Sequence, residues 1–246
     1  MKQRLALFAL CLTLAAQDRR LDNEAAIGRQ LAEQVRRSTT PVESQEAREY
    51  VARLGARLTG QLPNRAFAYT FSIVSTAQDN PLHEPLVIPG GYIFVPSNLI
   101  LATNDEAEFA GVLAQSMARG PLRIQNSIAT IPVIFIDSFT ADAALPAAIT
   151  NERRAMELRA DTIAVRAMSR AGFDPAGLAR YIERVQPPDQ PSSPFPPRDA
   201  RILALREAIR DIPTSAYSES DEFYATRERF RPAPAKPRAV PSLLTK

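Results

Sequence analysis

The sequence predicts an α+β protein that is mostly helical and carries a small antiparallel sheet. Helical periodicity recurs along most of the chain. Two short stretches, 66–75 and 92–95, are instead rich in strand-forming residues, and Pro89-Gly90-Gly91 supplies a turn before the second. Hydrophobic residues make up 45% of the 246 residues, so the chain can build a substantial core.

The first 17 residues have the pattern of a secretory signal peptide. Lys2 and Arg4 precede the apolar run Leu5–Ala16, which is too short to span a bilayer comfortably. We expect cleavage near residue 17, a periplasmic or secreted protein, and no stable membrane span afterwards. A retained membrane anchor and lipid attachment at Cys11 are the alternatives.

Two amphipathic helices should follow, at 21–37 and from Pro41 to about Gly60. After the strand at 66–75, the turn and the strand at 92–95, a short helical link is expected at 98–102. A helix should then cover 104–119, with acidic residues in its first turn and Pro121 as its end. The apolar stretch 128–136 reads as a core segment or a lipid-touching loop.

The second half of the chain should be helical except for one link. A long helix is expected at 148–171, ended by Gly172, and another begins at Asp174-Pro175 and reaches about Val185. The proline-rich segment 186–197 should be extended, either as a plain spacer or as a lid or partner-binding strand. A last helix is expected at 199–212, and the chain should be disordered from about Arg231.

The inventory of reactive side chains excludes several kinds of catalysis. The chain has one His, His83, and one Cys, and its lysines are Lys2, Lys236 and Lys246. Removal of the signal peptide would remove the Cys, so neither disulfides nor a thiol nucleophile are expected. His83 lies in a loop between prolines and is more typical of a surface His than of a ligand. The charge balance near neutrality, without a basic stripe interleaved with aromatics, argues against nucleic-acid binding.

Several segments, in order and spacing, resemble one family. They are VARLGARLTGQLP, IPGGYIFVPSNLILATNDEAEFAGVLAQSMARG, MELRADTIAVRAMSRAGFDPAGL and RDARILAL. Together they are similar to the exported zinc metallopeptidases of family 48, the HtpX-like and CAAX-prenyl-protease-like enzymes. The resemblance covers about residues 22–212 and implies a zincin (gluzincin) fold. With the expected signal peptide (1–17), the chain then divides into a metallopeptidase-like domain (21–212), which includes the proline-rich link, and a C-terminal extension (213–246).

The resemblance also implies which residues stand at the family's catalytic positions. The H-E-x-x-H motif, which supplies two zinc ligands and a general base, falls on Gln115, Ser116 and Arg119. The third ligand and the Asp one turn later fall on Glu157 and Asp161, which are retained. The active-site His near the closing segment falls on Phe195, and the segment before the Pro-Gly-Gly turn, Glu84-Pro85-Leu86, also differs from the family.

These substitutions predict loss of the metal site, and therefore no zinc and no other cofactor. Gln115 is a poor zinc ligand, Arg119 is a permanent cation, and Ser116 cannot deprotonate water as a Glu does. We expect the Arg119 guanidinium to replace the metal and to pair with Glu157, with Asp161 as a second candidate partner. The alternative is that Arg119 only caps the C-terminus of its helix.

The sequence therefore predicts a catalytically degenerate homologue that binds proteins or peptides without hydrolysing them, as a chaperone-like or scaffolding protein. Tyr92, Ile93, Phe94 and Val95 are expected to form an edge strand to which an extended peptide could add. The alternatives are an active or weakly active metalloendopeptidase with an atypical site, carboxylate chemistry at Glu157 and Asp161, or a purely structural envelope protein. The sequence does not indicate the oligomeric state.

Overall fold

The computed structural model describes residues 21–63, 68–75, 83–125, 147–188, 195–213, 217 and 219–231. The expected signal peptide, the apolar stretch 128–136, the middle of the proline-rich link and the chain after Arg231 lie outside these residues. Among the described helices, none combines the length and the apolar character that a membrane crossing requires. The α+β class is confirmed, because helices dominate and four strands form one small sheet.

The sheet is mixed rather than antiparallel. Its strands are β1 (Thr40–Pro41), β2 (Thr70–Ser75), β3 (Leu86–Ile88) and β4 (Tyr92–Pro96), in the spatial order β1-β2-β4-β3. β2 and β4 pair in parallel, while the two outer pairs are antiparallel. The prediction of an antiparallel sheet was therefore wrong at its central pair. The chain first forms β3 at the edge and then turns back, so β4 enters between β3 and β2 in the direction of β2.

The turn between β3 and β4 depends on two glycines. Pro89–Gly91 forms a single 3₁₀ turn, in which Gly90 has φ 78° and Gly91 has φ 87°. Residues with a Cβ rarely adopt these positive values, so the Pro-Gly-Gly sequence is what allows the tight reversal. This reversal places β3 beside β4 and leaves β3 at the border of the sheet.

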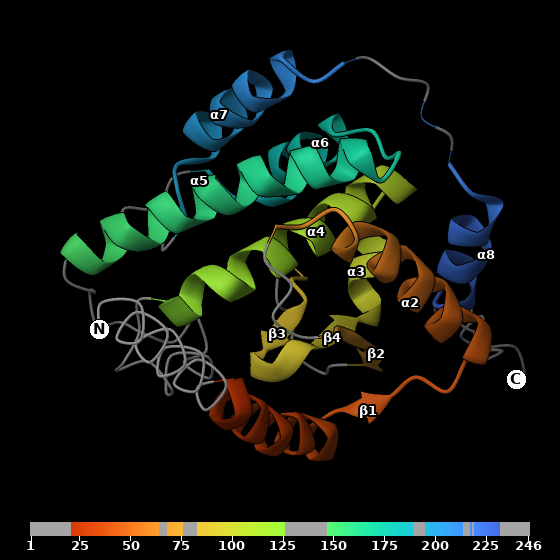
Figure 1. Cartoon of the computed structure of the whole chain (residues 1–246). Coiled ribbons are helices and arrows are strands. Elements are labelled where there is room, and N and C mark those ends of the chain that lie inside the picture. The colour runs from red at the N-terminus through yellow and green to blue at the C-terminus, as the bar shows by residue number, and fades with distance from the viewer. Residues whose placement is uncertain are drawn as a thin grey trace, which may run out of the picture.

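Helices cover both faces of the sheet (Figure 1). Along β4 the buried side chains alternate: Ile93 and Val95 belong to the main core, and Phe94 belongs to a second cluster with Ala32 and Val35 of the helical residues 21–38. This alternation is what a strand with a period of two residues gives when both faces are buried.

The remaining elements are helices that surround the site described below. They are α2 (Gln45–Thr59), α3 (Ser97–Ala102), α4 (Glu106–Gln125), α5 (Ala147–Arg170), α6 (Ala176–Val185), α7 (Arg198–Arg210) and α8 (Asp221–Arg229). The prediction that Pro121 ends α4 was wrong, because the helix continues to Gln125. A proline removes one hydrogen bond of a helix but does not by itself terminate it. α8 was not expected, although Ser220 caps it and Asp221 and Glu222 occupy its first turn.

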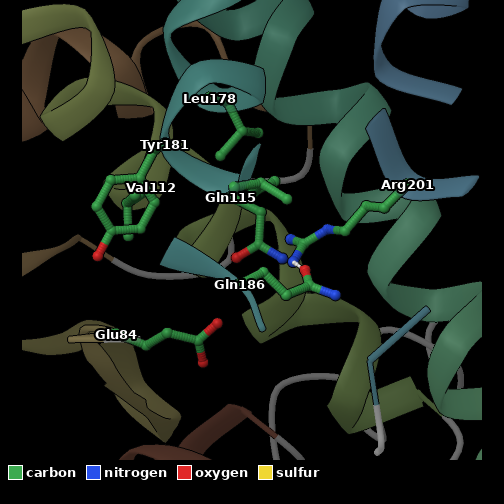
Figure 2. A pocket seen from close by; sticks show the side chains of 8 residues that line it. Glu84, Val112, Gln115, Leu178, Tyr181, Gln186 and Arg201 are labelled. Carbon is green, nitrogen blue, oxygen red and sulfur yellow. Dashed lines mark hydrogen bonds between the residues drawn. The ribbon is translucent and has the colours of Figure 1, made fainter. Parts of the chain in front are cut away.

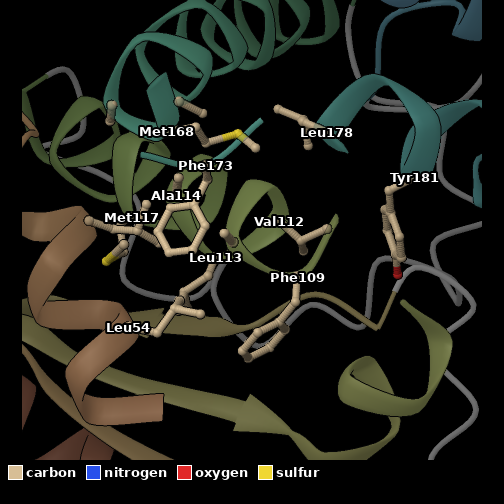
Figure 3. Close-up of a cluster of buried hydrophobic side chains, with 14 of the residues drawn as sticks. Leu54, Phe109, Val112, Leu113, Ala114, Met117, Met168, Phe173, Leu178 and Tyr181 are labelled. Atoms are coloured by element: carbon tan, nitrogen blue, oxygen red, sulfur yellow. The ribbon is translucent and has the colours of Figure 1, made fainter. Parts of the chain in front are cut away.

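α4 is the centre of the main hydrophobic core. Phe109, Leu113 and Met117, spaced four residues apart, are fully buried on one of its faces and are surrounded by side chains of α2, α5 and α6 (Figure 3). Gly111 allows α6 to approach, since a Cβ at this position would lie 2.9 Å from the Cβ of Leu178. α4 is thus held from several sides, and three of its buried polar positions, Gln115, Ser116 and Arg119, form the site.

Candidate functional site

A stripe of polar side chains runs along the buried side of α4 that faces α5. Gln115, Ser116 and Arg119 are exposed by only 2%, 0% and 6%. Polar groups this deep in a protein require hydrogen-bond partners, and an Arg requires an anion. These are the positions at which sequence comparison predicted a degenerate metal motif.

Arg119 lies between two carboxylates. Its Nη1 is 3.2 Å from Oε1 of Glu157, on α5, and 3.0 Å from Oε2 of Glu84, in the segment before β3. Nη2 of the same guanidinium lies 3.5 Å from the Ser116 hydroxyl oxygen. Burial opposes the charge of Arg119, but Glu157 and Glu84 outweigh this effect and hold the pKa of Arg119 above its usual value. The guanidinium is therefore a fixed positive charge at the centre of the site.

Both oxygens of the Glu157 carboxylate are engaged. While Oε1 faces Arg119, Oε2 accepts a hydrogen bond of 2.6 Å from the side-chain nitrogen of Gln115. Gln115 and Arg119 stand one turn apart on α4, so both reach the same carboxylate. The interpretation of Arg119 as only a C-terminal cap is wrong, because α4 extends six residues beyond it to Gln125.

Asp161 has a different partner from the one expected. Instead of approaching Arg119, it forms a two-pronged ion pair with Arg201 of α7, with distances of 2.6 Å from Nε and 2.8 Å from Nη2. Both side chains are almost fully buried, at 4% and 2% exposure. Burial raises the pKa of Asp161, while Arg201 lowers it in part. The pair joins α5 to α7 one turn beyond Glu157.

Arg201 also ties the proline-rich link to the site. Its Nη1 donates to the side-chain oxygen of Gln186, whose nitrogen in turn donates to the Pro196 carbonyl oxygen at 2.9 Å. Gln186 and Pro196 stand near the two ends of the link. Phe195, at the position of the family's active-site His, lies with its ring centre 5.9 Å from Cζ of Arg201. The described ends of the link are thus fixed against α5 and α7.

The space left between these groups is small. A cavity of about 20 Å³ is bordered by Glu84, Gln115, Gln186, Arg201 and apolar side chains of α4 and α6. Figure 2 shows Gln115, Gln186 and Arg201 converging on it, with Glu84 approaching from the side of β3. A cavity of this size holds about one water molecule. Tyr181 also borders this cavity, and burial, followed by the charge of Glu84, raises the pKa of its hydroxyl above the usual value.

The predicted edge strand is not at an edge. Tyr92–Val95 lie in β4, which pairs with β2 on one side and β3 on the other, and three of these four residues are almost fully buried. β3, like β1, is a border strand with one partner among the described residues. It also packs against α4 next to Arg119, since a Cβ on Gly120 would lie 2.9 Å from Cγ1 of Val87.

The single histidine lies apart from any group of metal-binding residues. His83 has φ 48° and is half-buried directly before Glu84. Within the described ranges, no three side chains of His, Cys, Asp or Glu gather in a way that could hold a metal ion. The acidic groups near the site are instead divided between two guanidinium groups.

Three residues of the site were missed as participants: Glu84, Gln186 and Arg201. Glu84 was recognised only as a departure from the family, although an acidic residue is a natural partner for an unexplained Arg. Arg201 lies in the segment RDARILAL, which was recognised by its resemblance and not by any role. A search for partners of the two retained acids on α5 could have suggested it.

Comparison with known proteins gives two findings. Residues 115–209 match Peptidase family M48. Over 89% of this chain, it is 24% identical to a relative from Vibrio cholerae, and over 88% it is 20% identical to the beta-barrel assembly-enhancing protease of Escherichia coli K12. The Yersinia pestis protein of the latter name is 21% identical over 85% of the chain. The chain spans about half the length of these curated relatives.

Proposed function

We infer that this chain binds extended polypeptides without hydrolysing them. The match of residues 115–209 to Peptidase family M48 and the similar relatives confirm the resemblance to zinc metallopeptidase family 48. The observation that carries this proposal is the position of Arg119. Its guanidinium lies between Glu157 and Glu84, where the family resemblance would place a metal ion. An exported, chaperone-like or scaffolding role in the bacterial envelope follows as part of the same proposal.

The donor set does not fit a catalytic zinc. Such a site requires about three protein ligands and one open position. Glu157 is the sole carboxylate among the family's ligand positions, and both of its oxygens already face protein donors, Gln115 and Arg119. A guanidinium cannot be deprotonated in a protein, so it would repel a divalent cation at this place.

The general base is also absent. The family's Glu is replaced by Ser116, a neutral hydroxyl within reach of the Arg119 guanidinium. A neutral hydroxyl near a fixed positive charge does not accept a proton from water near neutral pH. The buried carboxylates that remain, Glu157 and Asp161, are each held by a guanidinium. Carboxylate chemistry of the glycosidase kind is therefore disfavoured as well.

Metal content tests this part of the proposal. The purified chain should contain less than about a tenth of an equivalent of zinc by elemental analysis, and should not cleave an unfolded protein substrate. Restoring the motif by Gln115→His, Ser116→Glu and Arg119→His should create a site that retains about one zinc. Adding Glu157→Gln to that variant should remove it. Stoichiometric zinc in the unaltered chain, lost on Glu157→Gln, would overturn the proposal and favour the peptidase.

β3 is the strand best placed to receive a peptide. It borders the sheet, it follows Glu84 directly, and Val87 lies against α4 near Arg119. An extended chain that adds to such an edge gains main-chain hydrogen bonds regardless of its sequence. Since the named relatives are beta-barrel assembly-enhancing proteases, we propose that the occupant is an unpaired strand of a β-barrel protein.

Peptides with selective N-methylation test the mode of binding. Two versions of one barrel-strand peptide are prepared, each methylated at alternate residues so that one edge of the strand cannot donate hydrogen bonds. Addition to β3 uses one edge, so one version should lose binding by at least about tenfold, and the other should not. Fluorescence anisotropy measures both. Equal binding of the two versions and the unmodified peptide would rule out strand addition.

A further inference from the structure

The outward face of α5 carries a row of arginines that the proposed function does not use. Arg159, Arg166 and Arg170 are all exposed. None forms an ion pair with any residue in the part of the chain that the structure describes. Most exposed arginines elsewhere behave differently: Arg53, Arg206 and Arg210, for example, each contact a Glu.

The three arginines point in nearly one direction. With 100° per residue, Arg166 lies 20° from Arg159 around the helix axis, and Arg170 lies 20° from it on the other side. The buried residues Glu157, Asp161 and Ala164 occupy the opposite side, against α4 and α7. At a rise of about 1.5 Å per residue the row extends over roughly 16 Å. It forms a straight, positively charged strip on the surface, which we call the α5 strip.

No acid interrupts the α5 strip. Between Arg153 and Arg170 the helix contains two acids, Glu157 and Asp161, and both are buried and paired. A favourable interaction with the helix dipole explains a basic residue in the last turn, such as Arg170. That effect fades within one turn, so it does not explain Arg159, which stands eleven positions earlier. The strip itself therefore carries three positive charges and no acid, and the exposed Glu152 stands seven residues before its first arginine.

The chemistry of the strip favours phosphate groups on a lipid surface. Guanidinium groups bind phosphate in a two-pronged manner. Ile163, between the arginines in sequence, is half-buried and packs against the main core, so the strip would be attracted to a membrane by its charge. Nucleic-acid surfaces instead interleave basic with aromatic residues for base stacking, and α5 contains no aromatic residue.

We propose that the α5 strip binds the headgroups of anionic phospholipids, so that α5 lies along a membrane surface. This contact is peripheral and needs no membrane-spanning segment. It also leaves β3 free for a polypeptide, because β3 packs against α4 and not on the outward face of α5. The inference stands independently of the proposed peptide binding.

Vesicle flotation with charge-matched variants tests this proposal. The full chain is mixed with vesicles of phosphatidylcholine and phosphatidylglycerol in equal parts, or of phosphatidylcholine alone. One variant carries Arg159→Gln, Arg166→Gln and Arg170→Gln. The control carries Arg53→Gln, Arg206→Gln and Arg210→Gln, which changes the net charge equally at exposed sites outside the strip. Any contribution of residues 1–20 is the same in all three proteins.

The strip variant should bind the anionic vesicles on the order of 100-fold more weakly than the unaltered chain, and the control less than about fivefold. Binding of the unaltered chain should fall as salt is raised and should be weak on phosphatidylcholine alone. Equal loss in both variants, or equal binding to both kinds of vesicle, would overturn the proposal. Tighter binding to soluble polyglutamate or to duplex DNA than to the vesicles would overturn it too and identify the other class of partner.

Discussion

Two buried carboxylates on α5, one helical turn apart, are each neutralised by an Arg, but with different geometry. Asp161 receives Arg201 in a two-pronged arrangement, and Gln186 accepts from the third nitrogen. Glu157 receives Arg119 through a single nitrogen, which Glu84 shares. The first is a complete fork of parallel hydrogen bonds, whereas in the second one nitrogen donates a single hydrogen bond to each of two carboxylates.

The two pairs differ in origin. Asp161 and Arg201 form a well-matched structural ion pair, whereas Arg119 stands where the family has a zinc ligand. A guanidinium that matches its carboxylate with two hydrogen bonds is specified in position and orientation. Arg119 instead occupies a position that the family resemblance assigns to a zinc ligand, and it reaches each of its two carboxylates through one hydrogen bond. We therefore expect the two pairs to contribute unequally to stability, and mutation of each measures that difference.

The largest effect is expected at the two-pronged pair. Asp161→Ala should lower the free energy of unfolding by about 3–5 kcal/mol, because it leaves the Arg201 guanidinium buried without a counter-charge. Urea unfolding followed by circular dichroism measures it. A double variant with Asp161→Leu and Arg201→Met should recover part of the loss, since an apolar pair of similar size has no stranded charge. Failure of the double variant to improve on the single one would contradict this account.

A smaller effect is expected at Arg119. Arg119→Met should cost about 2–3 kcal/mol in the same unfolding experiment. Glu157 keeps its hydrogen bond from Gln115, and the Glu84 side chain is 21% exposed, so water solvates part of the freed charge. Arg119→Lys retains the charge and is the matched variant. A loss at Arg119 that equals or exceeds the loss at Asp161 would show that the geometry of the fork does not decide the ranking.

The sequence could predict one of these pairs because of where the resemblance is specific. Positions 119 and 157 belong to motifs that meet in the family, so their juxtaposition could be expected. Glu84 contacts Arg119 across 35 residues of sequence, and Arg201 contacts Asp161 across 40. Neither partner could be chosen without knowing how the segment before β3 and helix α7 pack. The sequence could show which catalytic groups the site lacks, but not which of the remaining side chains contact one another.

The sheet illustrates the same limit. Composition identified the stretches that became β2 and β4, but the three residues Leu86–Ile88 were too short to be assigned as a strand. Without β3, the strand Tyr92–Val95 was expected at an edge. The Pro-Gly-Gly turn directly after an Ile was a signal for a strand on both of its sides. Strand order depends on such short partners, which local periodicity does not reveal.

The buried hydrogen bond from Tyr50 to Glu106, away from the candidate site, can be compared with the buried ion pair of Asp161 and Arg201. The Tyr50 hydroxyl donates to Glu106 at 2.9 Å, and Ser220 supplies two more donors to the same carboxylate. Tyr50→Phe should therefore cost only about 1–2 kcal/mol. A cost comparable to that of Asp161→Ala would mean that burial alone, and not the two-pronged geometry, sets the large value.

The same tyrosine predicts a pH dependence. Burial, followed by the charge of Glu106, raises the pKa of Tyr50 above its usual value. In the unfolded chain the tyrosine loses its proton near pH 10, while in the folded chain it keeps it. Its contribution is thus fully present below about pH 10 and declines as the pH rises further. The unfolding free energy of Tyr50→Phe should fall less steeply above pH 10 than that of the unaltered chain, and parallel slopes would refute the assignment.

The smallest effect is expected at a pair that shares a helix with Arg201. Arg210 contacts Glu207 three residues earlier on α7, and both side chains are more than half exposed. Water and salt already solvate both charges, so Arg210→Gln should change the unfolding free energy by less than about 0.5 kcal/mol, and less still at high salt. Loss of the Arg210–Glu207 contact would then cost about a tenth of what loss of the Arg201–Asp161 pair costs. Since residue type and kind of partner are the same, a loss above about 1 kcal/mol at Arg210 would mean that burial and fork geometry do not explain the strength of the Arg201 pair.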